Sequence, residues 1–156
     1  MKSLTSLDMN KTEVNEPGLK ALAKLASLHT LNLSDTGVTD AGVRELAKLP
    51  NAGRLTELRL DRTAVTGDGL KGLAALTGLR TLSLAGTEID DLGVRHLAGL
   101  PTLQTLSLAK TAVTDEAFLD LARLKGLTAL DVTGSQVTAG GVAAFRKALP
   151  GCAVTR

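Results

Sequence analysis

Histidine and cysteine, two residue types that often perform catalysis, are rare in this sequence. The chain of 156 residues contains two histidines, His29 and His96, and one cysteine, Cys152. Acid–base or nucleophilic catalysis needs such groups to converge on one site, within hydrogen-bond reach of a partner. The histidines fall in different units of the repeat described below, and neither has a Cys or Ser partner at the same level. We therefore expect no catalytic residues and no enzyme activity.

Three aspartates recur at one position of the repeat and could act as a ladder of metal ligands, because carboxylates bind hard cations. They are Asp40, Asp91 and Asp115, and Gly67 and Ala139 interrupt the ladder in two other units. Each aspartate also follows a residue type that caps helices, and the helix dipole stabilises an acidic group in the first helical turn. Capping explains these aspartates with fewer assumptions, so we expect no metal and no cofactor.

Charged side chains in the first three units are the best candidates for binding a partner. Arg59 and Arg62 stand out because arginine is enriched at binding hot spots and forms bidentate contacts with carboxylates. Under the alternative, these charges pair across strands and only keep the surface soluble. The candidate partner-binding residues are Asp8, Lys11, Asn32, Asp35, Glu57, Arg59, Asp61 and Arg62.

A repeat that fills the chain must position these side chains. Its units begin at the first leucine of an LxxLxL pattern, at residues 4, 28, 55, 79, 103 and 127, so the steps are 24, 27, 24, 24 and 24 residues. The three extra residues lie in 48–55, before the strand predicted to carry Glu57 and Arg59. This segment is a secondary candidate for contact, and a neutral loop insertion is the alternative.

Each unit changes from a strand pattern to a helix pattern. The last two apolar residues of LxxLxL lie two positions apart, as on one face of a strand. Helical spacing follows, for example Leu70, Leu73 and Ala74 at i, i+3 and i+4. A single unit of this size cannot bury its apolar side alone, so the units must stack.

Two polar positions recur where the strand pattern gives way to the helix pattern. We expect the first, a hydroxyl in all six units, to satisfy the bends of adjacent units. The second holds good helix N-caps in all six units. The hydroxyl residues are Thr12, Thr36, Thr63, Thr87, Thr111 and Ser135, and the predicted N-caps are Asn15, Thr39, Thr66, Asp90, Thr114 and Thr138.

The pattern LxxLxLxxTxVTDxGLxxLAxL resembles that of the leucine-rich-repeat family, and all six units share it. It is most similar to the ribonuclease-inhibitor-like and cysteine-containing classes, including short-period bacterial members. The resemblance implies an α/β fold, a curved right-handed solenoid of six repeats of about 24 residues, with a parallel sheet on its concave face and helices on its convex face. It also implies binding of another protein through the concave face.

The whole chain, 1–156, is expected to form a single domain of this kind. At its end, Cys152 and Val154 are spaced like the last two apolar residues of a unit, which predicts a capping strand within 149–156 and a buried, unreactive Cys152. Solenoids need polar caps, and the first unit begins almost at once without one. The sequence therefore predicts either a piece of a longer protein or self-association through the N-terminal repeat.

Composition narrows the classes of partner. A formal net charge of +2 is too small for a strong phosphate-attracting field, so nucleic acid is not expected. The sequence has no signal-peptide stretch and no run of roughly 18 apolar residues, so we expect no membrane span and a cytoplasmic protein. The sequence favours a non-catalytic protein-interaction module, and the alternative is a structural or assembly segment of a larger or oligomeric protein.

Overall fold

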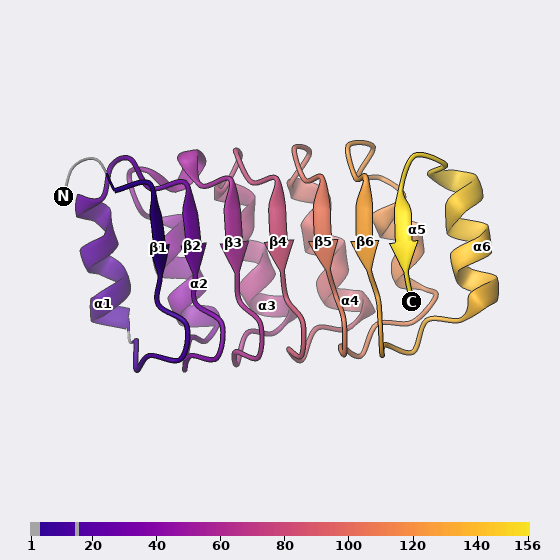
Figure 1. Cartoon of the computed structure of the whole chain (residues 1–156), viewed down its shortest axis with the longest axis horizontal. Helices are drawn as coiled ribbons and strands as arrows, with labels where there is room; N and C mark the ends of the chain where they lie inside the picture. The colour runs from indigo at the N-terminus through magenta and orange to yellow at the C-terminus, as the bar shows by residue number, and fades with distance from the viewer. Residues whose placement is uncertain (1–3, 15) are drawn as a thin grey trace.

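A computed structural model describes residues 4–14 and 16–156, apart from the side chain of Glu16. Its seven strands form one parallel sheet in which the spatial order follows the sequence (Figure 1). Each strand has three residues and is joined to the next by a helical segment on one side of the sheet, as in a right-handed solenoid. The strands are β1 (Ser6–Asp8), β2 (Thr30–Asn32), β3 (Glu57–Arg59), β4 (Thr81–Ser83), β5 (Thr105–Ser107), β6 (Ala129–Asp131) and β7 (Ala153–Thr155).

The middle residue of every strand is an apolar residue that points into the core. Leu31, Leu58 and Leu82 pair in register on adjacent strands, and each is 0% exposed. The residues on either side of them point away from the core and are at least partly exposed. This alternation is what a period of two residues requires, and it turns the first and third residues of each strand toward a shared outer face.

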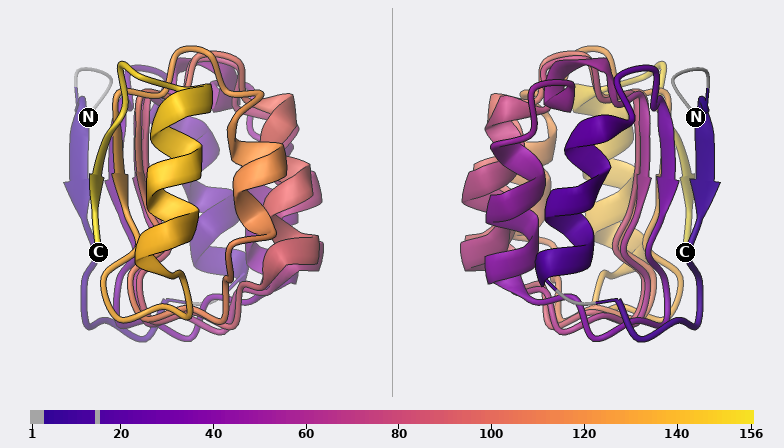
Figure 2. Two further views of the ribbon diagram at one scale, coloured as in Figure 1. Left: turned by 90° about the vertical axis from the view of Figure 1, so that its right-hand side faces the viewer. Right: turned by 90° about the vertical axis from the view of Figure 1, so that its left-hand side faces the viewer.

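The helical segments form a second layer that covers only one face of the sheet, as the two end views show (Figure 2). In the same views the outer strands β1 and β7 stand forward of the middle strands, so the uncovered sheet face is concave. The segments are α1 (Glu16–Ala21), η1 (Leu22–Lys24), α2 (Asp40–Ala47), η2 (Ala52–Arg54), α3 (Gly67–Leu70), η3 (Lys71–Ala75), α4 (Asp91–Val94), η4 (Arg95–Gly99), α5 (Ala117–Leu121) and α6 (Ala139–Ala148).

The helical spacing predicted from the sequence is only partly correct. In the third unit, α3 gives way after one turn to the 3₁₀ segment η3. A 3₁₀ helix has three residues per turn, so Leu70 and Leu73 share the buried side and Ala74 rotates outward. Both leucines are 0% exposed, whereas Ala74 is exposed. The α-helical i+4 position was therefore the wrong expectation for Ala74.

The column of hydroxyl residues is present, but it bonds within units rather than between them. Thr36 donates from Oγ1 to the carbonyl oxygen of Leu33 at 2.6 Å, and Thr63 donates to that of Leu60 at 2.7 Å. The four equivalent residues in the other units donate to the carbonyl three residues before them in the same way. The expectation that the column serves adjacent units was wrong, because the turn places each hydroxyl over its own strand end.

Contacts between units come instead from the aspartates that had been assigned to helix capping. The Asp91 carboxylate accepts hydrogen bonds from the backbone N–H of Thr114 at 2.8 Å and from its hydroxyl at 2.7 Å, one unit further on. Asp40 accepts the same pair from Thr66, and Asp115 from Thr138. We call these three pairs the Asp–Thr staples. They tie neighbouring units together at the starts of the helices.

The N-cap residues are confirmed in three units. The side chains of Thr66, Asp90 and Thr138 accept hydrogen bonds from backbone N–H groups in the first turn of the helix that follows them. Thr114 accepts from the N–H of Glu116, but α5 begins only at Ala117, with Glu116 as its N-cap, so the prediction for this unit was wrong. Thr39 precedes α2 without such a bond, and Asn15 lies outside the described residues. A capping threonine in a staple thus accepts from its own helix and donates to the unit before it.

The predicted capping strand is β7, which pairs with β6 and places Val154 beside Leu130. Cys152 is buried, as expected, and burial raises the pKa of its thiol. The predicted position of Cys152 in the repeat was wrong, however, because Val154 and not Cys152 pairs with Leu130. The N–H of Cys152 donates to the carbonyl of Leu149 as that of Leu127 donates to Leu124, so Cys152 takes the place of the first leucine of a unit. Cys152 and Val154 are two residues apart because this unit is one residue shorter there.

None of the helices in the described part of the chain is long and apolar enough to cross a lipid bilayer.

Candidate interaction surface

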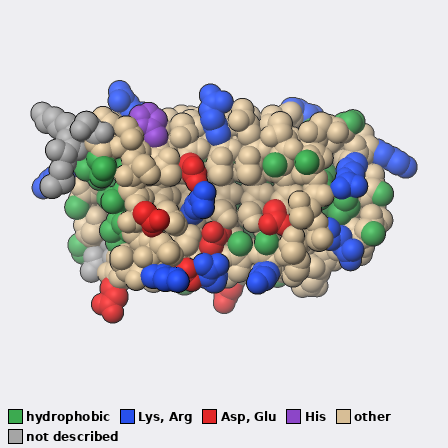
Figure 3. Space-filling view, viewed as in Figure 1, with side chains coloured by type: hydrophobic (Ala, Val, Ile, Leu, Met, Phe, Trp, Pro, Cys, Tyr) green, Lys and Arg blue, Asp and Glu red, His purple; other side chains and the backbone are tan. Residues whose placement is uncertain are grey.

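The structure gathers all eight candidate residues on the concave face of the sheet. Four of them lie on the first three strands: Asp8 on β1, Asn32 on β2, and Glu57 and Arg59 on β3. The other four follow the ends of these strands. Figure 3 shows this face, with acidic and basic side chains gathered over the first strands and few over the middle of the sheet.

The chain leaves each of the first six strands through a residue in the left-handed conformation. The positive φ angles are 56° at Lys11, 55° at Asp35, 52° at Arg62, 67° at Gly86, 55° at Lys110 and 71° at Gly134. This conformation is uncommon for residues other than glycine. The sequence analysis missed it, although the two glycines in this position were a signal. As a result, three of the candidate residues project from turns of matching geometry.

The turns are held in register by a ladder of backbone hydrogen bonds. The N–H of Asp35 donates to the carbonyl of Asp61 at 2.8 Å, and that of Arg62 donates to Ala85 at 2.8 Å. The N–H of Lys110 likewise donates to Thr133 at 2.8 Å. Because each turn is bonded to the next, the side chains they carry have fixed starting points.

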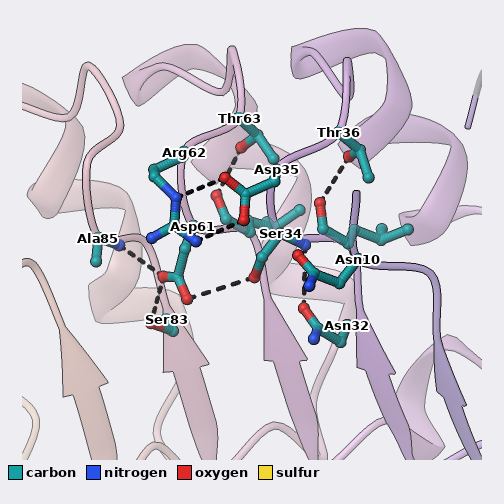
Figure 4. Close-up of polar contacts among 12 residues, drawn as sticks. Asn10, Asn32, Ser34, Asp35, Thr36, Asp61, Arg62, Thr63, Ser83 and Ala85 are labelled. Atoms are coloured by element: carbon teal, nitrogen blue, oxygen red, sulfur yellow. Dashed lines mark hydrogen bonds and ion pairs between the residues drawn. The ribbon is translucent and has the colours of Figure 1, made fainter. Parts of the chain in front are cut away.

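Arg62 and Asp35 form a bidentate ion pair between the second and third units. Arg62 donates from Nε to Asp35 Oδ1 at 2.6 Å and from Nη2 to Oδ2 at 2.5 Å (Figure 4). The hydrogen bonds from Arg62, together with its charge and that of Lys11, lower the pKa of Asp35, and Asp35 raises the pKa of Arg62. Both groups therefore stay charged near neutral pH. The Arg62 side chain is still 60% exposed.

A second arginine is held within its own strand. Arg59 donates from Nε to Glu57 Oε1 at 2.7 Å, and the two side chains are 53% and 28% exposed. The Nη groups of Arg59 have no hydrogen bond to any described residue. Glu57 thus orients the guanidinium and leaves its outer edge facing solvent.

Asp61 is the centre of a polar cluster that joins the second, third and fourth units. Its carboxylate accepts from the Ser83 hydroxyl, from the N–H of Ala85 at 2.8 Å and from the Ser34 hydroxyl at 3.4 Å. Figure 4 shows these groups converging on Asp61 from both sides. Asp61 therefore organises the surface and has little capacity left to accept bonds from a partner.

The remaining candidates differ in how far they are engaged. Asp8 accepts from the N–H of Asn10 at 2.8 Å, and Asn32 accepts from the N–H of Ser34 at 3.0 Å. Lys11 is exposed, and its ammonium group makes no hydrogen bond or ion pair to the residues that the structure describes. The alternative of pairing across strands thus holds for Asp35 alone among the acidic residues, because Glu57 pairs within its own strand and Asp8 and Asp61 accept from uncharged donors. The cationic groups keep unused donors, so the surface is suited to bind acceptors such as carboxylates.

The charged region borders a shallow part of the face with small side chains. On β4 and β5 the outward residues are Thr81, Ser83, Thr105 and Ser107. Small side chains let the backbone of a partner approach the sheet closely. No aromatic side chain lies on this face, because Phe118 and Phe145 are buried and stack on one another at a centroid distance of 4.6 Å.

The groups considered for catalysis do not form a site. His29 precedes β2, with Nδ1 2.6 Å from the carbonyl oxygen of Ser27, whereas His96 lies in η4 within the helical layer. Cys152 is buried in the last unit. Within 4–14 and 16–156, no group of three or more His, Cys, Asp or Glu side chains could hold a metal ion.

The three-residue insertion in 48–55 is attached to the preceding unit. Asn51 is buried and donates from Nδ2 to the carbonyl of Leu25 at 2.7 Å, while its Oδ1 atom is buried without a partner among the described residues. Arg54 donates to the carbonyl of Ala26 at 3.4 Å. These contacts give the segment a structural role between the first two units, at the strand-start edge of the sheet.

The sequence analysis also missed an apolar groove in the helical layer. It has a volume of about 450 Å³ and lies between α5 and α6, where Phe118, Leu119 and Phe145 contribute to its walls. Leu119 is 77% exposed. The short helices made this groove hard to anticipate, because their exposed sides do not follow the α-helical period.

Comparison with known proteins agrees with the repeat and with the fold. A family model described as Leucine Rich repeat matches residues 1–23, 24–47 and 76–98, and the seven-stranded parallel ladder extends the same architecture through the whole chain. Three segments of the chain are thus similar to leucine-rich repeats, and the fold agrees with this likeness. No curated protein matches the chain significantly.

Solved structures of two internalins from Listeria monocytogenes have the same fold. Internalin inlF superposes with a TM-score of 0.63 and 24% identity, covering 98% of this chain and 47% of that chain. Internalin C2 (inlC2) superposes with a TM-score of 0.66 and 26% identity, covering 99% of this chain and 72% of that chain. The chain thus spans about half of the length of internalin inlF, and the likeness to bacterial proteins matches the expectation from sequence.

Proposed function

We propose that this chain is a non-catalytic module that binds another protein through its concave sheet face. The observation that carries the proposal is the pair of arginines, Arg59 and Arg62, each oriented by an internal carboxylate and each more than half exposed. A guanidinium fixed in this way loses less side-chain freedom on binding, which favours association. The likeness to repeat proteins with extended concave surfaces supports the same function.

The arrangement of charges favours binding over simple solvation. If the ion pairs only neutralised surface charge, each arginine would donate all of its hydrogen bonds to its own carboxylate. Instead, the carboxylates of Asp35 and Glu57 each orient an arginine whose outer edge remains available. The small residues of β4 and β5 beside them leave room for the backbone of a partner. A cytoplasmic location remains a prediction from the sequence.

The proposal can be tested by affinity capture from the lysate of the source cell. We expect the native chain to retain a protein that a Glu57→Ala/Arg59→Ala/Arg62→Ala variant does not retain. A matched control is Lys20→Ala/Glu45→Ala/Lys48→Ala, which removes the same numbers of positive and negative charges from an ion-pair cluster on the helical layer. Equal retention by all three chains would contradict binding through the concave face.

A structural or assembly role is the second candidate function. It is favoured by the N-terminal end of the ladder, where β1 pairs only with β2 among the described strands and Leu4 is 37% exposed. An edge strand with unpaired backbone groups can pair with another chain. Sedimentation of the native chain and of Leu4→Asp tests this role, because a larger species that the substitution abolishes would support assembly through this end. A monomer in both samples would contradict self-association.

A further inference from the structure

A row of basic side chains extends beyond the predicted site along the strand-exit margin of the concave face. It consists of Lys11, Arg62 and Lys110, which we call the basic row. They occupy the same turn position in the first, third and fifth units, with φ angles of 56°, 52° and 55°. Figure 3 shows Lys and Arg side chains along the lower margin of this face, below the ends of the strands.

The turn itself does not require these side chains. In the fourth and sixth units the same turn is made by Gly86 and Gly134, which adopt the left-handed conformation without strain. A lysine or arginine there costs conformational energy, and unusual backbone conformations of this kind often mark function. Asp35, the remaining member of the series, has a structural explanation because it pairs with Arg62. Lys11 and Lys110 have no such pairing with any described residue.

The glycine that follows Arg62 in the series of turns and the one that follows Lys110 also make room for these two side chains. A Cβ atom on Gly86 would lie 3.0 Å from Cγ of Arg62, and one on Gly134 would lie 3.2 Å from Cγ of Lys110. The stems of Arg62 and Lys110 therefore lie across the next turn. In this series Asp35 separates Lys11 from Arg62, and Gly86 separates Arg62 from Lys110, so no two basic residues occupy neighbouring turns.

The spacing of the row is set by the sheet. Neighbouring strands lie about 4.8 Å apart, so residues two units apart are separated by about 9.6 Å. A polyproline II chain has three residues per turn and rises about 3.1 Å per residue, so every third side chain lies on one face with a repeat of about 9.3 Å. A β-strand peptide does not match, because residues three apart point to opposite faces.

We propose that the basic row binds an extended acidic peptide in the polyproline II conformation, which crosses the strand ends with a carboxylate at every third residue facing Lys11, Arg62 and Lys110. The proposal rests on the proposed function, since it names the class of partner for the concave face. Asp61 and the other acidic groups of this face already accept internal bonds, so the donors that remain are suited to carboxylates.

A nucleic-acid strand fits the same surface less well. It carries a negative charge at every nucleotide, with about 3.4 Å of helix rise per phosphate on each strand of a duplex, so phosphates would also face Asp35. Proteins that bind single strands usually stack bases on aromatic side chains. The chain has no Trp or Tyr, and Phe118 and Phe145 are buried away from this face.

The test uses a fluorescent (Glu-Pro-Pro)₄ peptide, whose binding to the full chain is followed by anisotropy. At about 20 mM salt, where exposed charges are weakly screened, we expect saturable binding that is lost as salt is raised. A peptide of equal composition with its four glutamates adjacent should bind at least fivefold more weakly, because only one or two of them can reach the row. Equal binding of the two peptides would overturn the spacing argument.

Glycine variants test the row without disturbing the turns. Exposed ion pairs contribute up to about 1 kcal/mol, or about fivefold in affinity. Each of Lys11→Gly, Arg62→Gly and Lys110→Gly should therefore weaken binding of (Glu-Pro-Pro)₄ about fivefold, and the triple variant about 100-fold if the sites act independently. Glycine suits the left-handed turn, so the variants should stay folded, which circular dichroism can check.

A charge-matched control removes three lysines from the helical layer, as Lys20→Ala/Lys24→Ala/Lys147→Ala, and should bind the peptide within twofold of the native chain. Equal losses in the control and in the triple glycine variant would show attraction by net charge and would overturn the proposal. So would the absence of saturable binding at about 1 mM peptide, the weak end of specific recognition.

Two further outcomes separate this inference from the proposed function. A 20-nucleotide oligothymidylate that binds more tightly than the peptide, and depends on the row, would overturn the assignment to a peptide. A second outcome would overturn the present inference and leave the proposed function standing. In that outcome, capture of a cellular protein requires Arg59 and Glu57, whereas Lys11→Gly and Lys110→Gly leave peptide binding unchanged.

Discussion

The contribution of an Asp–Thr staple to the free energy of unfolding can be predicted from its hydrogen bonds. In Asp91→Ala, the N–H and the hydroxyl of Thr114 lose the carboxylate that accepts both of their hydrogen bonds, at 2.8 and 2.7 Å. A hydrogen bond to a charged group contributes about 1.5–3 kcal/mol. The carboxylate is partly exposed and serves both bonds, so the two contributions do not add fully. We expect the free energy of unfolding to fall by about 2–3 kcal/mol.

The assay is urea unfolding of the native chain and its variants, followed by circular dichroism. Thr114→Val removes only the hydroxyl and keeps the backbone N–H, so it should cost about 1 kcal/mol. The double variant should be less destabilised than the sum of the single variants, because both changes remove the same bond. Glu88→Ala is the matched control, since Glu88 is an exposed acidic residue in the neighbouring loop with no side-chain bond to the described residues.

A change of less than about 0.5 kcal/mol for Asp91→Ala, the usual scale of surface substitutions, would refute the reasoning. So would equal effects of Asp91→Ala and Glu88→Ala. Either result would mean that the stack of units is held by apolar packing alone, and that the aspartates serve only the starts of their helices.

Two further predictions concern the core and the response to pH. Leu82→Ala should lower the free energy of unfolding by about 2–5 kcal/mol, because Leu82 is 0% exposed between Leu58 and Leu106. Urea unfolding measures this loss, and Leu119→Ala, at an exposed leucine, is the control. Equal losses in the two variants would contradict the register of the strands. The hydrogen bonds from Thr138 lower the pKa of Asp115 in the folded chain, so its contribution is present above the unfolded value of about 3.9 and is lost as pH falls through the folded value. The difference in urea midpoint between the native chain and Asp115→Asn should therefore be larger at pH 7 than at pH 2, and a difference independent of pH would contradict this.

The staples also explain a correlation within the sequence. Where Asp40, Asp91 or Asp115 occupies the staple position, the next unit provides a threonine that donates to it. In the third unit Gly67 takes the staple position, and the next unit has Asp90, which caps its own helix instead. A carboxylate at both positions would place two negative charges side by side. The sequence shows that aspartate at the staple position is followed by threonine in the next unit, and glycine by aspartate. The reason becomes clear only from the structure, which shows that these two positions of adjacent units face one another.

The concave surface could be predicted only in part, because the sequence shows which strand residues face outward but not the conformation of the turns. The period of two residues in LxxLxL decides which strand residues leave the core, so Glu57 and Arg59 could be placed on the outer face from sequence. The conformation of the turns could not be predicted from Lys11 and Arg62, because a positive φ is uncommon for these residue types, although aspartate, present as Asp35, is enriched there. Lys110 was therefore left out of the predicted site, although it occupies the same turn position as Lys11 and Arg62.

The sequence by itself determined the stack: a hydrophobic period of about 24 residues, too short to fold alone, leaves parallel pairing of neighbouring units as the way to bury the leucines. It also determined the N-caps Thr66, Asp90 and Thr138, because capping is local to a few residues. Only the tertiary structure decided which carboxylate each staple threonine meets and how Asp35 meets Arg62, because these contacts join residues 23 to 27 apart that become neighbours only when the units are stacked. It also decided where helices tighten to 3₁₀ turns and which carbonyl each turn hydroxyl uses, because these depend on local backbone geometry that residue types alone do not encode.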